Sequence, residues 1–227
     1  MRIALTVALA ASVAAVSVAA GVLVVAPPAS AEPTYVCPPA CSRIPDAAWI
    51  SPADIPLAAH YSWQPLAGLA VMSAAPRFRF EELCGSPAAP ADPRGYSVAE
   101  HVVITNPVGQ WQLQAQILHW RGETWRGGQL ALDVVAGAAA ALRSCQQTNP
   151  VASPSLTLDE PDRLAAVISG PVILHQYLLA DPVSSTVTEL ALWSSAPPAI
   201  PYPTLSDTAV LDALGAPLCS AYLGSCQ

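Results

Sequence analysis

A long apolar segment at the start of the chain decides the chemical environment in which the remainder folds. Arg2 precedes a mostly apolar run over residues 3–25, and Ala-Ser-Ala occupies residues 29–31. A charged start, an apolar stretch and a small-x-small site are the layout of a secretory signal peptide. We therefore expect residues 1–31 to be a signal peptide that is cleaved after Ala31, and the domain that follows to fold outside the cytoplasm.

The same segment is also long enough to remain uncleaved as a membrane anchor, because about 20 apolar residues span a bilayer. Such an anchor would leave the domain on the same, extracytoplasmic side. Attachment as a lipoprotein is disfavoured, since the first cysteine, Cys37, lies well beyond the apolar run. No later segment approaches a second span, so we expect no membrane span in the mature chain.

Six cysteines follow the predicted cleavage site, and an even number in an exported chain indicates a disulfide framework. Six cysteines allow fifteen connectivities, and the sequence alone does not select one. The pairing that we favour is Cys37–Cys41, Cys84–Cys145 and Cys219–Cys226. Zinc is the alternative, but Cys-x3-Cys and Cys-x6-Cys without a neighbouring histidine do not match the usual spacing of zinc ligands.

The balance of charged residues disfavours several classes of partner. The chain has 16 acidic residues against 9 basic ones, all of them arginine, and its net charge is −7. Loss of Arg2 with the signal peptide would leave 8 arginines and a net charge of −8. An acidic domain without a basic cluster is a poor binder of nucleic acid or of an anionic membrane. The absence of lysine also disfavours a standard nucleotide-phosphate loop.

Residues 32–77 are predicted to form a proline-rich arm that precedes an α+β domain over residues 78–227. The first part of the arm contains six prolines between residues 33 and 56, which disfavours a long helix. Ser51 and Pro52 are typical of the start of a single helical turn. Residues 66–73 are apolar, and the pattern there fits a short strand or a short helix equally well.

The strongest strand signal is a pair of segments that a turn separates. Residues 97–105 are rich in β-branched side chains, and residues 111–120 alternate between apolar and glutamine side chains. Asn-Pro-Val-Gly at residues 106–109 is typical of a turn, so a β-hairpin is predicted. Residues 78–81 also alternate and are predicted to form a strand.

The second half of the domain is predicted to contain two helices and three strands. A Gly-Gly break at residues 127–128 is expected to precede a helix over residues 129–145, whose small face from Gly137 to Ala141 would allow close packing on a sheet. Strands are expected over residues 164–169, 172–180 and 186–194. A final helix is expected over residues 206–214, with Pro217 interrupting it before residue 222. These elements predict an α+β fold: a disulfide-stapled antiparallel sheet of about five to six strands with helices packed on one face.

No segment carries a catalytic, cofactor-binding or metal-binding motif, and no residue is assigned to those roles. The chain lacks the signatures of serine hydrolases, nucleotide-binding loops, zinc peptidases and dinucleotide-binding folds. Its four histidines are scattered, and His119 beside Trp120 is expected to serve packing. The acidic run over residues 159–162 lacks the glycine turn and distal glutamate of a calcium loop, so a solvated turn is expected.

A ligand groove is the most specific functional feature that the pattern suggests. Trp120 and Trp125 flank a short connection and are expected to be an exposed pair, although tryptophan also commonly fills protein cores. Gln112, Gln114 and Gln116 form an uncharged row on one strand face, which would be either solvated or the lining of a polar cleft. The candidate groove comprises these two tryptophans and three glutamines.

The order of the segments resembles a known group of proteins. A strand pair, a helix ending at Cys145, further strands over residues 164–194 and a final helix follow one another over about residues 78–223. This layout is similar to that of the extracytoplasmic sensor domains of mycobacterial receptor-type serine/threonine kinases and of their free-standing secreted relatives. The resemblance implies an α+β fold with disulfides and a cleft that binds a ligand of unknown identity. It carries over no functional residue.

These observations lead to one expected function and two alternatives. We expect a secreted, non-catalytic binding or sensor-like domain of the actinobacterial cell envelope, which captures a small ligand or a protein partner in a cleft. The source is inferred from the exclusive use of arginine with high alanine and proline content, which indicates a GC-rich genome. The alternatives are an envelope hydrolase with a non-standard site and a purely structural secreted protein. A hydrolase should gather titratable groups of shifted pKa in one pocket, and a structural protein should show an exposed apolar patch instead.

Overall fold

The computed structural model describes residues 36–88 and 90–225. The predicted signal peptide and Cys226 lie outside the described residues. The helices are α1 (Ala58–Tyr61), α2 (Arg79–Cys84), α3 (Thr124–Thr148) and α4 (Asp207–Ala221), and the strands are β1 (Val71–Met72), β2 (Val98–Ile104), β3 (Gln112–His119), β4 (Ser153–Asp159), β5 (Arg163–Ser169), β6 (Val172–Asp181) and β7 (Thr186–Ser195). Among the residues so described, no helix is both long and apolar enough to cross a membrane.

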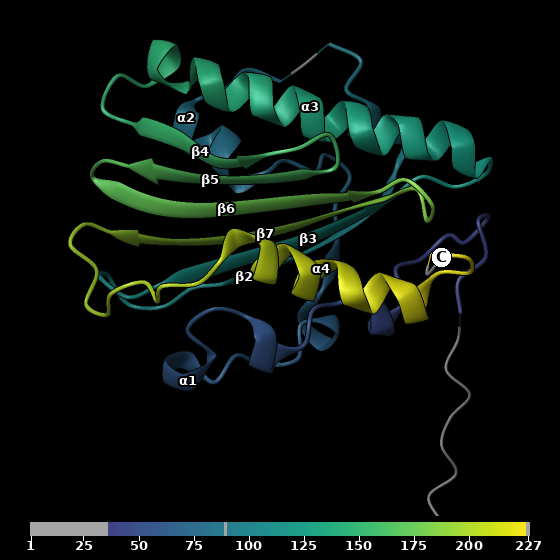
Figure 1. Ribbon diagram of the computed structural model, residues 1–227, viewed down its shortest axis with the longest axis horizontal. Coiled ribbons are helices and arrows are strands. Elements are labelled where there is room, and N and C mark those ends of the chain that lie inside the picture. Colours follow the sequence, from purple (N-terminus) through teal and green to yellow (C-terminus); the bar gives the residue numbers. More distant parts are fainter. Residues whose placement is uncertain (1–35, 89, 226–227) are drawn as a thin grey trace, which may run out of the picture. The chain divides into compact units, whose positions relative to one another are not determined.

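One antiparallel sheet of seven strands, in the order β1-β2-β3-β7-β6-β5-β4, forms the centre of the fold (Figure 1). The α+β class and the antiparallel sheet are therefore confirmed, whereas the predicted number of strands was too low. The two additional strands lie at the two edges: β1 falls within residues 66–73, where a short strand was one of two open alternatives, and β4 was not predicted. Strand β1 has only two residues, and β4 contains Pro154, which is tolerated there because an edge strand leaves one row of N–H groups unpaired.

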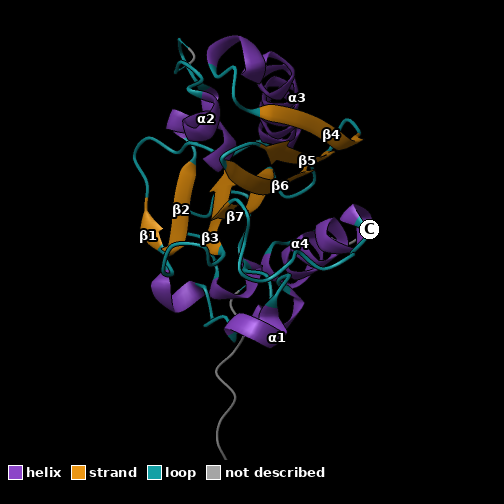
Figure 2. Ribbon diagram, turned by 90° about the vertical axis from the view of Figure 1, so that its left-hand side faces the viewer, coloured by secondary structure: helices purple, strands orange, loops and turns teal. Residues whose placement is uncertain are grey.

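Helices cover both faces of the sheet, not one face as predicted. Helices α2 and α3 lie on one face, while α4 and the N-terminal arm cover the other (Figure 2). The reason is visible in β7, where Val187 and Ala191 face α3 while Leu190 and Leu192 face the arm and α4, and all four are buried. A central strand that is apolar on both sides needs cover on both sides.

Helix α2 replaces the strand that was predicted over residues 78–81. Phe78 stands at its N-cap, and the Glu81 carboxylate accepts the backbone N–H of Phe78 at 2.8 Å. Gly85 ends the helix in the left-handed conformation that glycine adopts without strain. Phe78 and Phe80 are both fully buried, so their spacing reproduces the alternation of a strand within a short helix.

Helix α3 begins before the Gly-Gly pair that was predicted to precede it. A Cβ atom on Gly127 would lie 2.5 Å from the Ser185 Oγ, and one on Gly128 would lie 2.4 Å from the Pro182 carbonyl oxygen. The pair is therefore what allows the first turns of α3 to approach the β6–β7 turn closely. Helix α4 likewise continues through Pro217, where an interruption was predicted.

The predicted hairpin is confirmed, with Ala99 opposite Leu118 in the β2–β3 register. Two predicted disulfides are confirmed as well: Cys37–Cys41, with Cα atoms 5.5 Å apart, and Cys84–Cys145, with Cα atoms 5.0 Å apart. Cys219 is also disulfide-bonded. The Cys84–Cys145 disulfide joins α2 to α3, so it fixes two helices that cover the same face of the sheet.

Two glycines of α3 should respond in opposite ways to the same substitution. We expect Gly128→Ala to lower the free energy of unfolding by about 2 kcal/mol, because the added methyl meets the Pro182 backbone. We expect Gly137→Ala to raise it by about 1 kcal/mol, since nothing lies within 4 Å of a Cβ there and alanine is the better helix former. Urea denaturation of both variants measures the difference, and equal effects would contradict the close approach of α3 to the β6–β7 turn.

Candidate functional site

The clearest candidate site is a groove of about 390 Å³ between α3 and the segment that follows α2. We call it the α3 groove. The described residues that line it are Phe78, Glu81, Ser86, Pro87, Ala88, Pro90, Asp92, Pro93, Arg94, Asp133, Val134, Gly137, Ala138, Ala141, Ser144 and Thr148. Its size lies at the lower end of the range for pockets that hold small molecules.

One stripe of α3 forms the helical wall of this groove. Asp133, Gly137, Ala141, Ser144 and Thr148 follow one another at spacings of three and four residues, so they lie above one another on the helix surface. Three of the five have very small side chains, and Gly137 has open space above its Cα. The groove exists because this stripe has little volume to fill it.

A second cavity, of about 980 Å³, lies at the N-terminal end of the same helix. We call it the arginine cleft, because Arg121 and Arg126 are among its lining residues. Arg126 and Leu130 continue the stripe of the α3 groove toward the start of the helix, again at a spacing of four residues. Pro93 borders both cavities. The groove and the cleft are thus neighbours along a single face of α3.

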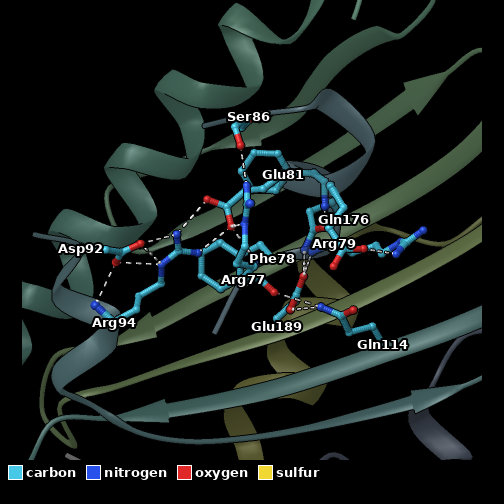
Figure 3. A network of polar contacts seen from close by, with 12 residues as sticks. Arg77, Phe78, Arg79, Glu81, Ser86, Asp92, Arg94, Gln114, Gln176 and Glu189 are labelled. Carbon is cyan, nitrogen blue, oxygen red and sulfur yellow. Dashed lines mark hydrogen bonds and ion pairs between the residues drawn. The ribbon is translucent and has the colours of Figure 1, made fainter. Parts of the chain in front are cut away.

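A buried ion cluster forms the floor of the α3 groove (Figure 3). The Arg94 guanidinium donates to both carboxylate oxygens of Glu81, at 2.7 and 2.8 Å, in a bidentate pair. It also donates to Asp92 through Nε at 3.0 Å and through Nη2 at 2.6 Å. The guanidinium carbon lies 4.8 Å from the centre of the Phe78 ring. Arg94 is therefore held by two carboxylates and an aromatic face at once.

The electrostatics of this cluster keep its charges in place. Burial by itself would raise the pKa of Asp92, but the hydrogen bonds and the positive charge of Arg94 outweigh it, so the pKa of Asp92 is lowered. Burial would lower the pKa of Arg94, but Glu81 and Asp92 raise it instead. Three ionised groups consequently satisfy one another at the floor of the groove.

Three further polar side chains of the groove are also engaged within the protein, and one of them, Asp133, accepts the side-chain amide of Gln129 at 2.8 Å. The Thr148 hydroxyl donates to the backbone carbonyl of Cys84 at 2.6 Å, and the Ser144 hydroxyl donates to that of Ala141 at 3.0 Å. A bound molecule would therefore find mainly alanine, proline and phenylalanine surface to contact. Such a lining suits an apolar ligand, because an apolar ligand needs no hydrogen bonds from the protein.

A second polar network anchors α2 on the sheet beneath the groove (Figure 3). Glu189 of β7 accepts the backbone N–H of Arg79 at 2.7 Å and the side-chain amides of Gln176 and Gln114, both at 3.0 Å. The Gln176 carbonyl in turn accepts the backbone N–H of Phe80 at 3.2 Å. Side chains from the sheet thus hold the first backbone donors of α2.

Glu189 has no cationic hydrogen-bond partner among the described side chains. It is 1% exposed, and burial raises its pKa to about 7, despite the three hydrogen bonds that favour the ionised form. It lies under α2 and does not line the α3 groove. The role that follows from this geometry is to position α2, not to exchange protons with a ligand.

Removal of this charge should change how stability depends on pH. The folded pKa of about 7 lies above the ordinary value of 4.5, so the stabilisation by the protonated carboxyl is complete at low pH and is lost as the pH rises through 7. The variant Glu189→Gln keeps the size of the side chain. Its new amide nitrogen can donate to the side-chain carbonyl of Gln114 once the Gln114 amide has turned over. We expect the unfolding free energy of this variant, minus that of the wild type, to rise by about 3 kcal/mol between about pH 5 and pH 8.

Denaturant titrations of both proteins across this pH range measure that difference. Taking the difference cancels the opposite contribution of His175, whose pKa is lowered by burial to about 4. A difference that stays constant with pH would contradict the assignment of a buried, proton-binding Glu189.

The structure does not bring the five residues of the predicted groove together. Trp120 is 4% exposed, so the prediction of an exposed tryptophan pair was wrong; it borders the arginine cleft, where its indole N–H donates to the Pro93 carbonyl at 3.0 Å. Trp125 is exposed and is not among the lining residues. Gln112 bonds the backbone of the β2–β3 turn, while Gln114 and Gln116 are buried against the sheet. Gln114 and Gln116 are therefore not solvated, and the segment that follows β1 covers Gln114, whose amide donates to the Arg77 carbonyl at 3.2 Å.

The groove that does form was missed, although one signal for it was present. The small face of α3 was recognised, but it was assigned to packing on the sheet. In the structure Ala139 packs in the core, Ala138 packs in the core and also borders the groove, and Gly137 and Ala141 face the groove. The proline and alanine content of the segment after α2 gave no indication that it forms the opposite wall.

Two of the histidines serve packing. His119 is buried and stacks on the Tyr222 ring at 4.8 Å, and the His175 ring lies 3.5 Å from that of Tyr202. Within the described part of the chain, no group of three or more histidine, cysteine, aspartate or glutamate side chains is placed to hold a metal ion.

Comparison of the chain with protein families, with curated proteins and with solved structures finds no match. The resemblance to extracytoplasmic kinase sensor domains stays a prediction. The argument for function therefore rests on the two cavities along α3 and on the groups that line them.

Proposed function

We propose that this chain is an exported binding domain that captures an apolar, chain-like molecule in the α3 groove. The observation that carries the proposal is the lining of the groove. Its wall is a stripe of small side chains on α3, and the ionised residues of its floor are already paired with one another. An apolar molecule can displace water from such a surface without leaving a buried charge unsatisfied.

Two further features support a role in capture. The groove is long and narrow, because the stripe from Asp133 to Thr148 extends about 22 Å along the helix axis. Its walls are held together by the Cys84–Cys145 disulfide and by the hydrogen bond from Thr148 to Cys84. A fixed groove reduces the cost of ordering the protein on binding.

The site favours binding over the alternative of an envelope hydrolase. The two carboxylates that line the groove floor, Glu81 and Asp92, are committed to Arg94, and Glu189 does not reach the groove. The third carboxylate of the lining, Asp133, is exposed to solvent and accepts the side-chain amide of Gln129 at 2.8 Å. Both histidines of lowered pKa pack among aromatic side chains. A proton-transfer site would need a free acid or base facing the ligand.

Disulfides support the extracytoplasmic part of the proposal, because they persist in oxidising compartments. A domain of this kind in an actinobacterial envelope would sequester or sense an apolar envelope component. The alternative that the sequence left open is capture of a protein partner. In that case the residues that recognise the partner would lie on the outer surface of the domain and not in the α3 groove.

The methyl ester of cis-parinaric acid tests the proposal, since its fluorescence rises when its unbranched apolar chain leaves water. We expect the wild-type domain to bind it, and Gly137→Phe to abolish binding, because the phenyl ring would occupy open space in the groove. Ala136→Phe is the matched control, since Ala136 is exposed on the same helix and does not line the groove. Equal binding by the two variants would contradict the proposed site.

A further inference from the structure

The charges along α3 are distributed in a way that bears on the chemistry of the bound molecule. Five arginines of the described chain form ion pairs with carboxylates: Arg77, Arg79, Arg94, Arg143 and Arg163. Arg43 is engaged within the protein as well. Neither Arg121 nor Arg126 forms an ion pair or a side-chain hydrogen bond with another described residue. Both are exposed, and both line the arginine cleft. In a chain of net charge −7, two uncompensated cations in one cavity are an exception.

The acidic groups near the two cavities favour one orientation of a charged molecule. Among the described residues that line the cleft there is one carboxylate, that of Glu123, and it accepts the indole N–H of Trp125 at 3.1 Å. The groove lining has three carboxylates, those of Glu81, Asp92 and Asp133, against one arginine, Arg94. Arg77, which pairs with Glu81 at 3.9 Å, does not line the groove. The cleft lining is therefore positive on balance and the groove lining negative. An anion would be attracted to the first and repelled from the second.

The distance between the two sites suits a single extended molecule. Arg126 precedes Gly137 by 11 residues on the same helix, which corresponds to about 16 Å along its axis. Pro93 borders both cavities, so the groove and the cleft meet beside it. A chain lying in the groove can thus place its end in the cleft without leaving the helix surface.

From this arrangement we infer that the ligand of the α3 groove is a free single-chain amphiphile with an anionic head, held at the head by Arg121 and Arg126. The inference rests on the proposed function, since it adds a head-group site to the apolar groove. Guanidinium groups bind carboxylate and phosphate oxygens through charge-assisted hydrogen bonds. The groove volume of about 390 Å³ fits one narrow chain better than the paired chains of a membrane lipid.

The test compares cis-parinaric acid with its methyl ester, which have the same chain and differ only in the charge of the head. Both are titrated below their micelle-forming concentrations, at about pH 8 where the acid is ionised. We expect the wild type to bind the acid about tenfold more tightly than the ester, which corresponds to about 1.4 kcal/mol. The variant Arg121→Gln/Arg126→Gln should bind the two equally. Arg143→Gln, which removes an exposed arginine paired with Asp159, is the control and should keep the preference.

Added salt supplies a second readout, because charges at the surface are screened over about 3 Å at 1 M ionic strength. The preference for the acid should shrink in high salt, while binding of the ester should not weaken. Equal binding of acid and ester by the wild type, with both blocked by Gly137→Phe, would overturn the head-group site and leave the apolar groove in place. A preference that persists in the double arginine variant would also overturn it. Failure of the wild type to bind either molecule would contradict the groove itself.

Discussion

Replacement of Arg94 with leucine is expected to lower the free energy of unfolding by about 3–5 kcal/mol. Leucine fills part of the volume but leaves Glu81 and Asp92 without the guanidinium that satisfies them. Glu81 is only 8% exposed, so its carboxylate would lose its bidentate partner in a place that water barely reaches, with Arg77 at 3.9 Å as its remaining cation. The cost comes from this poorly compensated buried carboxylate more than from the loss of the ion pair itself.

The dependence on pH separates this explanation from a simple packing defect. Asp92 has a lowered pKa, so its pairing stabilises the wild type above the ordinary value of 3.8 and is lost as the pH falls through its folded pKa. Protonation also relieves the unpaired carboxylates of the variant. We therefore expect the deficit of Arg94→Leu to be smaller at about pH 4 than at about pH 7. A deficit that does not change with pH would show that packing, not charge, is responsible.

Removal of the disulfide between α2 and α3 is the second change with a large expected effect. Cys84 and Cys145 are separated by 61 residues, and the chain-entropy treatment of such a loop gives about 4 kcal/mol of stabilisation. Both cysteines are fully buried, so the variant Cys84→Ala/Cys145→Ala should introduce no unsatisfied polar group. We expect its unfolding free energy in urea to fall by about this amount.

The short disulfide provides a matched comparison. Cys37 and Cys41 are only 4 residues apart, so loss of this disulfide adds little conformational entropy to the unfolded chain. The variant Cys37→Ala/Cys41→Ala should lower the free energy of unfolding by about 2 kcal/mol on the same treatment. The variant Cys84→Ala/Cys145→Ala should additionally bind methyl parinarate more weakly, because loss of the disulfide loosens the walls of the α3 groove. Equal destabilisation by the two variants, with unchanged binding, would contradict the role given to the α2–α3 bond.

The elements that were predictable from the sequence are those whose pattern is local. The β2–β3 hairpin follows from alternation on both sides of a turn sequence, and the pairing of the first four cysteines follows from export and spacing. Helix α2 was missed because Phe78 and Phe80 alternate as strand residues do, while the core contacts that bury both rings come from distant parts of the chain. Strand β4 was missed because Pro154 is compatible with a strand only at an edge, and the edge is set by the topology.

The site was less predictable for a related reason. The glutamines of β3 have the alternation of a solvated face, and only the position of α2 converts Gln114 into a partner of Glu189. The small residues of α3 are visible in the sequence, but which of them face the sheet and which face the groove depends on how the helix lies. Arg121 and Arg126 become exceptional only once every other described arginine is seen to have a partner.

Photolabelling of the native domain tests the central claim most directly. A long-chain fatty acid with a diazirine at mid-chain would be irradiated with the protein, and the reduced protein digested with trypsin. Cleavage after arginine yields residues 80–94, 127–143 and 144–163, which together carry nearly all of the residues that line the α3 groove. The account predicts that the adducts concentrate on these three peptides and are lost in Gly137→Phe but not in Ala136→Phe. Adducts that lie elsewhere, or that persist in Gly137→Phe, would contradict the assignment of the α3 groove as the binding site.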